Sequence, residues 1–571
     1  MNLEFTTEQQ EVLKAIYEGG LSDGKSYIVN MPYGTGKTII GLEAIEKTLA
    51  KYPAGLKKLA FYTSGGDGGS LRIHQAGILA KEHGYPILGS LGTKKLYFRK
   101  ITKRDRVLLQ KIKSGSSPSR DYAKPDKTSS VFLQVTDLRK VMQDSPKWAD
   151  VELLVIDEID EVARQDFEGY RGFSVKEQFQ ELFQKVKQFH IPVIGLTATG
   201  NDYMLDFLCH TLRVDKSTAV IGADYKSPYR YDSKIKLVND AYVEKINTLL
   251  VEGIHLCTGK IAKLSGIEDA SSLFKLIYMG LPKLFLKKPV DGVFTLDFYQ
   301  DGVASPIKLR FREEKVEELK EIKRELNLYS SSRIILLNST PDHLYNVLKK
   351  SYILKIRDVN EAWIAIEKFI GEAEENETVL MKGGRNALLK KLEDLMEKVT
   401  DRWLQIFMLS FLRAKRPYLQ GKLLSTVYEA LKKADNGQKV VLITRFVTMA
   451  KALQESLEKM SQQKVGCLTG QDSTKVREKV IEDFRYGTTN LLVLNKLGSK
   501  GLDLKTADCV MHVDIDSNKE TMKQRRERIR GGEEVLVVYA NTGEGQKIED
   551  YVKLSENEQL IEQYQQLADE F

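Results

Sequence analysis

The stretch Met31-Pro32-Tyr33-Gly34-Thr35-Gly36-Lys37-Thr38 decides the fold class of this 571-residue chain. It follows a short apolar run, SYIVN at 26–30, and it leads into the helical pattern TIIGLEAIEKTLA at 38–50. A buried run, a glycine-rich loop and an amphipathic stretch in this order predict a strand, a tight turn and a helix.

The loop itself has the residue types of a phosphate-binding site. Gly34 and Gly36 let backbone N–H groups fold around phosphate oxygens, and the start of the helix adds its positive end. The loop, which includes Thr35, departs from GxxxxGK[ST] only at its first position, a methionine. Lys37 can reach the β- and γ-phosphates, and the Thr38 hydroxyl can ligate Mg²⁺. We therefore expect nucleotide binding here.

A pair of carboxylates follows a second apolar strand, ELLVIDEID at 152–160. In a parallel sheet the carboxyl ends of the strands lie beside the phosphate loop. Asp157 can then hold Mg²⁺ through water, and Glu158 can orient and deprotonate an attacking water. Alone, the carboxylates could be an acidic cap on the next helix. Together with the loop, they favour nucleotide hydrolysis.

Further strands and helices alternate around these motifs. Apolar strands are expected at 57–63, 131–135, 152–156 and 192–197, and again at 440–446, 464–470, 490–495, 508–515 and 534–540. Alternation of this kind predicts βαβ units and parallel sheets. The region between the two blocks reads mainly as amphipathic helix, with a hairpin formed by VFTLDFY and IKLRF and one more strand at 331–339.

The predicted fold class is therefore α/β, with two parallel-sheet domains, the first of which carries the phosphate loop, and a mostly helical domain inserted between them. The expected boundaries are a first ATP-binding domain at 1–235, an insertion at 236–415, a second domain at 416–550 and a helical tail at 551–571.

Composition excludes several classes of protein. Hydrophobic residues make up 42% of the chain, which is enough to bury a core and argues against disorder. No apolar stretch is long enough for a membrane span, and the N-terminal MNLEFTTEQQ lacks the layout of a signal peptide. The four cysteines are far apart and suit buried thiols in a reducing compartment. We expect a cytoplasmic, nucleoid or nuclear protein.

Taken together, the motifs resemble those of superfamily 2 helicases and translocases. Four further matches occur in the family's order: Thr136 after a strand; GLTATG at 195–200 with Thr197 and Thr199; LTG at 468–470 with Arg477 and Phe484; and LGSKGLD at 497–503 with Gly501 and Asp503. The resemblance implies that both α/β blocks are RecA-like parallel-sheet P-loop domains. It implies ATP and Mg²⁺ as cofactors and a strand contact at Thr136. It also implies that Thr197 and Thr199 couple hydrolysis to movement, and that Gly501 and Asp503 approach the nucleotide.

A fifth match, QRRERIR at 524–530, resembles the motif that supplies the family's arginine finger. Register from Gln524 assigns the first finger to Arg528, but the second falls on Gly531 where the family has arginine. A one-residue deletion restores the match at Arg530, so both arginines stay candidates. The family also reads adenine through a glutamine before the phosphate loop, which implies Gln10, with its neighbour Gln9 also a candidate.

One alternative concerns the coupling motif. Ile334–Pro341 also resembles the Ser-Gly-Thr form of that motif, found in helicases whose first domain is interrupted by an arch. That assignment would place 200–330 within the first domain. GLTATG has the commoner spacing from the carboxylates and is preferred.

Charge is concentrated in one segment. The chain has a net charge of +8, yet residues 93–127 alone hold twelve Lys/Arg and three Asp, a net charge of +9. Tyr97, Phe98 and Tyr122 alternate with this charge, so phosphate neutralisation and base stacking could both occur there. The candidate nucleic-acid contacts are Lys94, Lys95, Arg99, Lys100, Lys103 and Arg104. A strand-separating wedge would be sought near Lys283, Lys287, Lys288, Arg310 and Arg312 of the insertion.

These observations predict a nucleic-acid-dependent ATPase that moves along or unwinds a strand, with DNA favoured over RNA by analogy with insertion-bearing branches of the family. An RNA helicase is the alternative substrate assignment. Two alternatives belong to another class of protein. One is a nucleic-acid sensor that uses ATP only to switch state. The other is a motor subunit of a restriction, defence or repair complex whose nuclease is on another chain.

Overall fold

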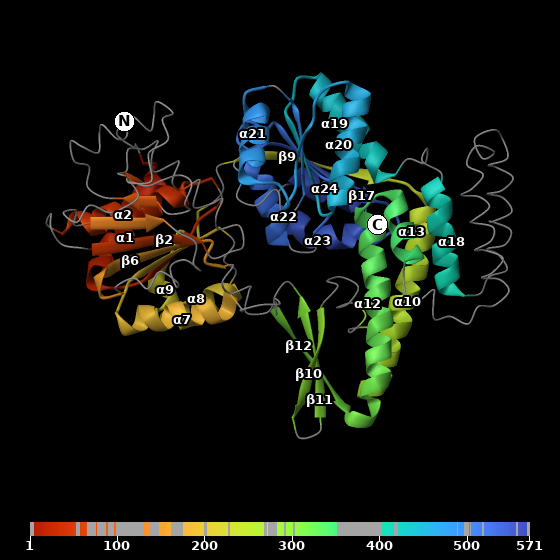
Figure 1. Cartoon of the computed structure of the whole chain (residues 1–571), viewed down its shortest axis with the longest axis horizontal. Helices are drawn as coiled ribbons and strands as arrows, with labels where there is room; N and C mark the ends of the chain where they lie inside the picture. The colour runs from red at the N-terminus through yellow and green to blue at the C-terminus, as the bar shows by residue number, and fades with distance from the viewer. Residues whose placement is uncertain are drawn as a thin grey trace. The chain divides into compact units, whose positions relative to one another are not determined.

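The computed structural model describes residues 5–32, 34–52, 58–64, 76, 87–88, 96–98, 131–135, 148–160, 175–198, 202–225, 229–267, 271, 274, 283–290, 293–300, 303–350, 401–415, 421–487, 489–495, 502, 504–516, 519–554 and 558–567. These residues divide into two compact units between Arg230 and Tyr231. Each unit is built around its own sheet (Figure 1).

The first unit contains an eight-stranded sheet whose central strands are parallel. In spatial order its strands are β3 (Ile87–Leu88), β4 (Leu96–Phe98), β5 (Val131–Val135), β2 (Lys58–Ser64), β6 (Val151–Asp157), β7 (Val193–Thr197), β1 (Tyr27–Asn30) and β8 (Val220–Ile221). Only the β3–β4 and β4–β5 pairs are antiparallel. The five strands predicted for this region are confirmed, and the short strands β3, β4 and β8 were not expected.

Helices cover both faces of this sheet, because alternate residues of β1, β2, β6 and β7 are apolar and buried on opposite sides. The helices are α1 (Thr7–Glu18), α2 (Lys37–Ala50), α7 (Val175–Gln188), α8 (Asp202–Leu212) and the short α9 (Lys216–Ala219). Side chains of α1 and α2 share one core with β1, β2, β6 and β7. Side chains of α7 and α8 share a second core with the opposite face.

The second unit contains a six-stranded, fully parallel sheet. In spatial order its strands are β14 (Gly466–Leu468), β15 (Leu491–Asn495), β13 (Val440–Thr444), β16 (Cys509–His512), β17 (Gly532–Tyr539) and β9 (Tyr231–Val238). All five strands predicted here are confirmed. Strand β9 pairs with β17 along its whole length, from Tyr231 opposite Gly532 to Val238 opposite Tyr539. The domain boundary expected at residue 235 therefore falls inside a strand of the second sheet.

The helices of the second unit pack on this sheet in two separate hydrophobic cores. They are α10 (Ala241–Ser265), α12 (Val316–Asn338), α13 (Pro341–Lys349), α18 (Arg402–Lys415), α19 (Lys422–Asp435), α20 (Val447–Ser461), α21 (Thr474–Arg485), α22 (Lys519–Arg526), α23 (Glu544–Leu554) and α24 (Glu558–Leu567). Buried residues of α10, α12, α13 and α18 cluster with those of β13, β15, β16 and β17. The described part of the insertion thus packs directly on the second sheet. Helices α23 and α24 pack on β17 and its neighbour β9, so the tail expected from residue 551 begins within α23.

The insertion also holds a small antiparallel sheet, drawn beside the lower part of α12 in Figure 1. Its strands, in order, are β10 (Lys283–Val290), β11 (Val293–Gln300) and β12 (Val303–Arg312). The predicted hairpin corresponds to β11 and β12, with β10 as an additional strand. The strand predicted at 331–339 is wrong, because those residues continue α12 to Asn338. None of the described helices combines the length and apolar character needed to cross a bilayer.

Candidate nucleotide site and arginine motif

The phosphate loop joins β1 to α2 with the backbone conformation that its glycines predict. Gly34 and Gly36 have φ of 76° and 81°, in the left-handed region that favours glycine. Gly36 directly precedes α2, and the Thr35 hydroxyl donates to the Pro32 carbonyl at 2.8 Å. A side chain at Gly34 would come within 2.8 Å of the Tyr229 ring. The loop is therefore a tight cradle at the start of a fourteen-residue helix.

The Lys37 ammonium lies inside this cradle. Its Nζ donates to the carbonyls of Met31 and Pro32, each at 2.8 Å, and both Lys37 and Thr38 are half-buried. The side chain therefore folds back over the loop instead of extending into solvent. Its positive charge and the start of α2 act on the same small volume, which suits an anion.

Of the two candidate glutamines, Gln9 contacts the loop and Gln10 does not. Gln9 Nε2 donates to the Thr35 carbonyl at 2.7 Å, while Gln9 also closes a capping box with Thr6 at the start of α1. Gln10 Nε2 instead donates to the Phe5 carbonyl at 2.9 Å on the exposed side of the helix. Gln9 is therefore the glutamine that contacts the loop, and the assignment of Gln10 to the nucleotide stays a prediction.

The carboxylates lie at the carboxyl end of β6. Asp157 accepts from the Tyr62 hydroxyl at 2.9 Å and from the Glu158 backbone N–H at 3.0 Å. Glu158 has a φ of 50°, a conformation that costs an L-residue about 1–2 kcal/mol. Both carboxylates are half-buried and so remain accessible. Tyr62 therefore orients Asp157, and the turn at Glu158 carries the chain away from the sheet edge.

Strand β7 brings the loop and the carboxylates to one edge, because it lies between β1 and β6. Asn30, the last residue of β1, pairs with Thr197, and Asp157 pairs with Leu196. The Thr197 hydroxyl donates to Asp160 Oδ1 at 2.8 Å, and these two side chains are 0% and 1% exposed. The Thr197 carbonyl accepts from the Met31 N–H at 3.1 Å. Thr197 thus contacts the start of the phosphate loop and the end of the carboxylate motif.

The predicted arginine motif spans the end of α22 and the turn after it. Arg525 and Arg526 are buried, while Arg528 and Arg530 are half-buried and remain available as finger candidates. Arg530 has a φ of 54°. The Arg528 carbonyl accepts from the Leu504 N–H at 3.0 Å, which ties this turn to the segment that follows 497–503. Gln524 lies in α22, and its side chain is outside the described set.

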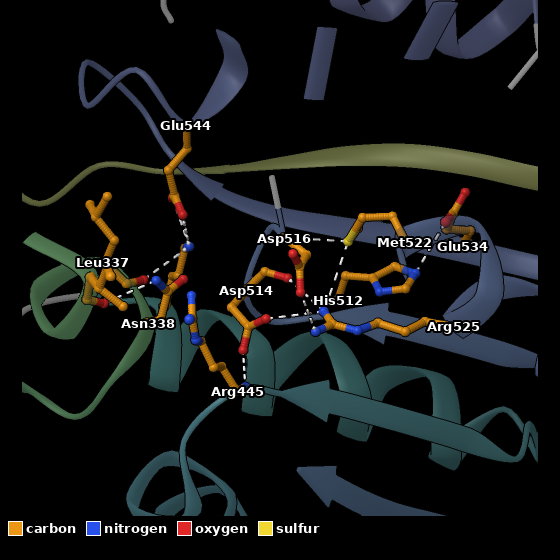
Figure 2. A network of polar contacts seen from close by, with 12 residues as sticks. Leu337, Asn338, Arg445, His512, Asp514, Asp516, Met522, Arg525, Glu534 and Glu544 are labelled. Carbon is orange, nitrogen blue, oxygen red and sulfur yellow. Dashed lines mark hydrogen bonds and ion pairs between the residues drawn. The ribbon is translucent and has the colours of Figure 1, made fainter. Parts of the chain in front are cut away.

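Two carboxylates hold Arg525 in place. Its guanidinium donates to Asp514 Oδ1 and Asp516 Oδ2, each at 3.1 Å, as Figure 2 shows. Asp514 also accepts from the Arg445 backbone N–H. Asp514 and Asp516 follow β16, so α22 is fixed to the carboxyl edge of the second sheet. Sequence reasoning missed this pair, although a D-x-D spacing after a buried strand was a usable signal.

Arg526 belongs to a different network on the same helix. Its guanidinium stacks on the rings of Tyr231 and Tyr551 and lies 3.8 Å from Glu534. Burial raises the pKa of Glu534, but the His512 hydrogen bond and the Arg526 charge outweigh burial and hold that pKa below its usual range. The Tyr551 and Ser233 hydroxyls donate to the same carboxylate. Arg526 therefore stabilises the fold.

Several predicted site residues lie outside the described part of the chain. These are Thr199, Gly501, Asp503, Thr136 and the basic set Lys94, Lys95, Arg99, Lys100, Lys103 and Arg104. The rival coupling motif at 334–341 is described, and it does not follow a strand, because Ile334–Asn338 belong to α12.

Comparison with known families agrees with this geometry. Residues 6–207 match the family model described as DEAD/DEAH box helicase, and residues 422–532 match the helicase conserved C-terminal domain. Among solved structures, the chain is similar to "Crystal structure of Pyrococcus furiosus Hef helicase domain", with 15% identity and a TM-score of 0.46. That alignment covers 96% of this chain and 99% of the other.

Proposed function

Because the chain belongs to the superfamily 2 helicases and is an ATP-hydrolysing enzyme, we propose that it acts on DNA, coupling hydrolysis to movement along a strand or to its unwinding. The observation that carries this proposal is the meeting of the phosphate loop, Thr197 and the Asp157–Glu158 pair at the ends of β1, β7 and β6. Phosphoryl transfer needs charge neutralisation and a positioned water, and this edge of the sheet offers residues for both.

The residues present fit ATP and Mg²⁺. The glycine-rich cradle, with positive φ at Gly34 and Gly36, leaves no room for a Cβ and presents backbone N–H groups. We assign the phosphates to this backbone and to Lys37, and the Mg²⁺ to Thr38 and Asp157. When bound, ATP·Mg²⁺ supplies the transferable phosphoryl group and a cation that neutralises its charge. Gln9 is the glutamine we assign to the adenine edge.

Each remaining residue has a role that follows from its contacts. Glu158 is half-buried at the end of β6 and would accept a proton from the attacking water. Thr197, whose hydroxyl is hydrogen-bonded to Asp160, would transmit a change at the carboxylates to the segment that follows β7. Arg528 or Arg530 would stabilise charge on the γ-phosphate in the transition state, with Arg525 and its two carboxylates as positioning residues.

Nucleic-acid-stimulated ATP hydrolysis tests the proposal. We expect single-stranded or duplex DNA to raise kcat more than RNA of the same sequence does, and Lys37→Ala to abolish hydrolysis. Strand displacement by the wild type, lost in Lys37→Ala, would distinguish a helicase from a switch. Stronger stimulation by RNA would reassign the substrate, and no stimulation by any nucleic acid would overturn the motor function.

A further inference from the structure

The three-stranded sheet of the insertion has two chemically different faces. Residues that pair across an antiparallel sheet lie on the same face, and successive residues alternate. The register places Leu284, Leu286, Phe294, Leu296, Phe298, Leu309 and Phe311 on one face. It places Lys283, Phe285, Lys287, Val290, Val293, Thr295, Asp297, Tyr299, Lys308, Arg310 and Arg312 on the other, which we call the basic face. One face is wholly apolar, and the other has five cations and one carboxylate.

The described side chains of β12 show which face is covered. Leu309 and Phe311 are each 2% exposed and belong to the core that includes α10 and α12. Arg310 and Arg312, which alternate with them, are exposed. The Lys315 ammonium, just after β12, donates to the Leu264 carbonyl at the end of α10 at 3.2 Å. Leu309 and Phe311 are therefore packed with the long helices, and Arg310 and Arg312, on the basic face, are turned to solvent.

The cations of the basic face are regularly spaced. Lys308, Arg310 and Arg312 are alternate residues of one strand, so their Cα atoms are about 6.8 Å apart, the axial rise of about two phosphates in one strand of B-form DNA. Cross-strand pairing sets Arg310 beside Thr295 and Thr295 beside Lys287, which adds a second cation to the same row. The Arg310 and Arg312 side chains are both exposed, so an anion in solution can reach them.

We propose that this basic face binds the phosphodiester backbone of the nucleic acid on which the enzyme acts. The proposal rests on the proposed function and adds a second contact surface, built into the insertion, to the one expected at 93–127. Repeated cations on a regular strand match a polymer with regularly repeated negative charge. Phe285 and Tyr299 on the same face add aromatic residues of the kind on which unpaired bases stack.

The test compares two double variants that remove the same charge. Arg310→Ala with Arg312→Ala removes two exposed cations from the basic face. Lys432→Ala with Lys459→Ala is the control, because both lysines are exposed near the C-terminal ends of α19 and α20, away from the insertion. Binding of labelled single-stranded and duplex DNA is measured by fluorescence anisotropy between ~50 and ~200 mM salt.

We expect the arginine variant to bind about tenfold more weakly at low salt, whereas the control stays close to the wild type. The slope of log affinity against log salt should fall by about 1.4 for single strands or about 1.8 for duplex, the value for two lost phosphate contacts. If the affinity falls for only one of the two DNA forms, single-stranded or duplex, that form is the one bound by the basic face. An unchanged thermal unfolding midpoint shows that folding is intact, and Lys287→Ala with Lys308→Ala repeats the test with other cations of the face.

The outcomes separate this inference from the proposed function. If the wild type binds DNA and DNA stimulates its ATPase, but both basic-face variants keep the wild-type affinity and salt slope, the inference is overturned and the proposed function stands. If the wild type neither binds nor responds to any nucleic acid, both are overturned.

Discussion

Asp516→Asn tests how the arginine motif is held, with almost no change of shape. The Arg525 and Asp516 side chains are 3% and 8% exposed, and their ion pair spans 3.1 Å. Hydrogen bonds to charged groups contribute about 1.5–3 kcal/mol, so we expect the asparagine to weaken the anchoring of α22 by about 2 kcal/mol. If that energy is lost from the transition state, kcat falls about 30-fold, since about 1.4 kcal/mol corresponds to tenfold. Asp514 retains its contact with Arg525, so the fold should survive.

The assay is steady-state ATP hydrolysis with saturating DNA, read as kcat and KM separately. An arginine that acts only on the transition state lowers kcat and leaves the KM for ATP almost unchanged. Asp483→Asn is the control, because it makes the same chemical change in a surface pair with Lys464, whose side chain is 64% exposed. Such pairs contribute about 0–1 kcal/mol. Equal kcat values in the two variants would refute the positioning role.

Three further changes test other parts of the molecule. Gly36→Ala should weaken binding of a fluorescent ATP analogue at least about tenfold, because φ is 81° and a Cβ would meet the Gln9 amide; wild-type affinity would contradict this. Lys422→Met should lower the free energy of unfolding in urea by about 3–5 kcal/mol, because it leaves the Glu544 carboxylate, 1% exposed, without its cation; adding Glu544→Gln should restore part of the loss. Because the pKa of Glu534 is lowered by folding, its contribution to stability is complete above the ordinary value of 4.5 and is lost as the pH falls through the lowered pKa. Glu534→Gln should therefore flatten the fall of the unfolding temperature below pH 4.5, and an unchanged pH profile would contradict the assignment.

The strands at the site could be predicted because they are continuous apolar runs buried on both faces, which is a local signal. Strand β9 is different, since YDSKIKLV mixes apolar and polar residues and only Ser233 and Val238 of its eight residues are buried. Its partner β17 is about 300 residues away, as the Ser233–Glu534 contact shows. Nothing local indicates which sheet receives such a strand.

The site residues also divide into those that the local sequence predicts and those that only the structure can assign. The phosphate loop, the carboxylate pair and the arginine motif are short stretches, and their order and spacing along the chain predict them. Choosing between Gln9 and Gln10 needs the phase of α1, because neighbouring residues on a helix point about 100° apart. The run Ile334–Leu337 fits a strand or a buried helix equally well, and only its continuity with α12 decides.

The pairing of β9 with β17 has a consequence for the order in which the chain can fold. Residues 1–230 form a unit that can assemble early in synthesis, and domains generally fold as units while the ribosome is still working. The second sheet cannot be completed until Gly532–Tyr539 has been made, so Tyr231–Val238 must wait, unpaired, through most of translation. A waiting strand with free N–H and C=O groups invites pairing with another chain. Its charged residues Asp232, Lys234 and Lys236 are of the kind that discourages such pairing.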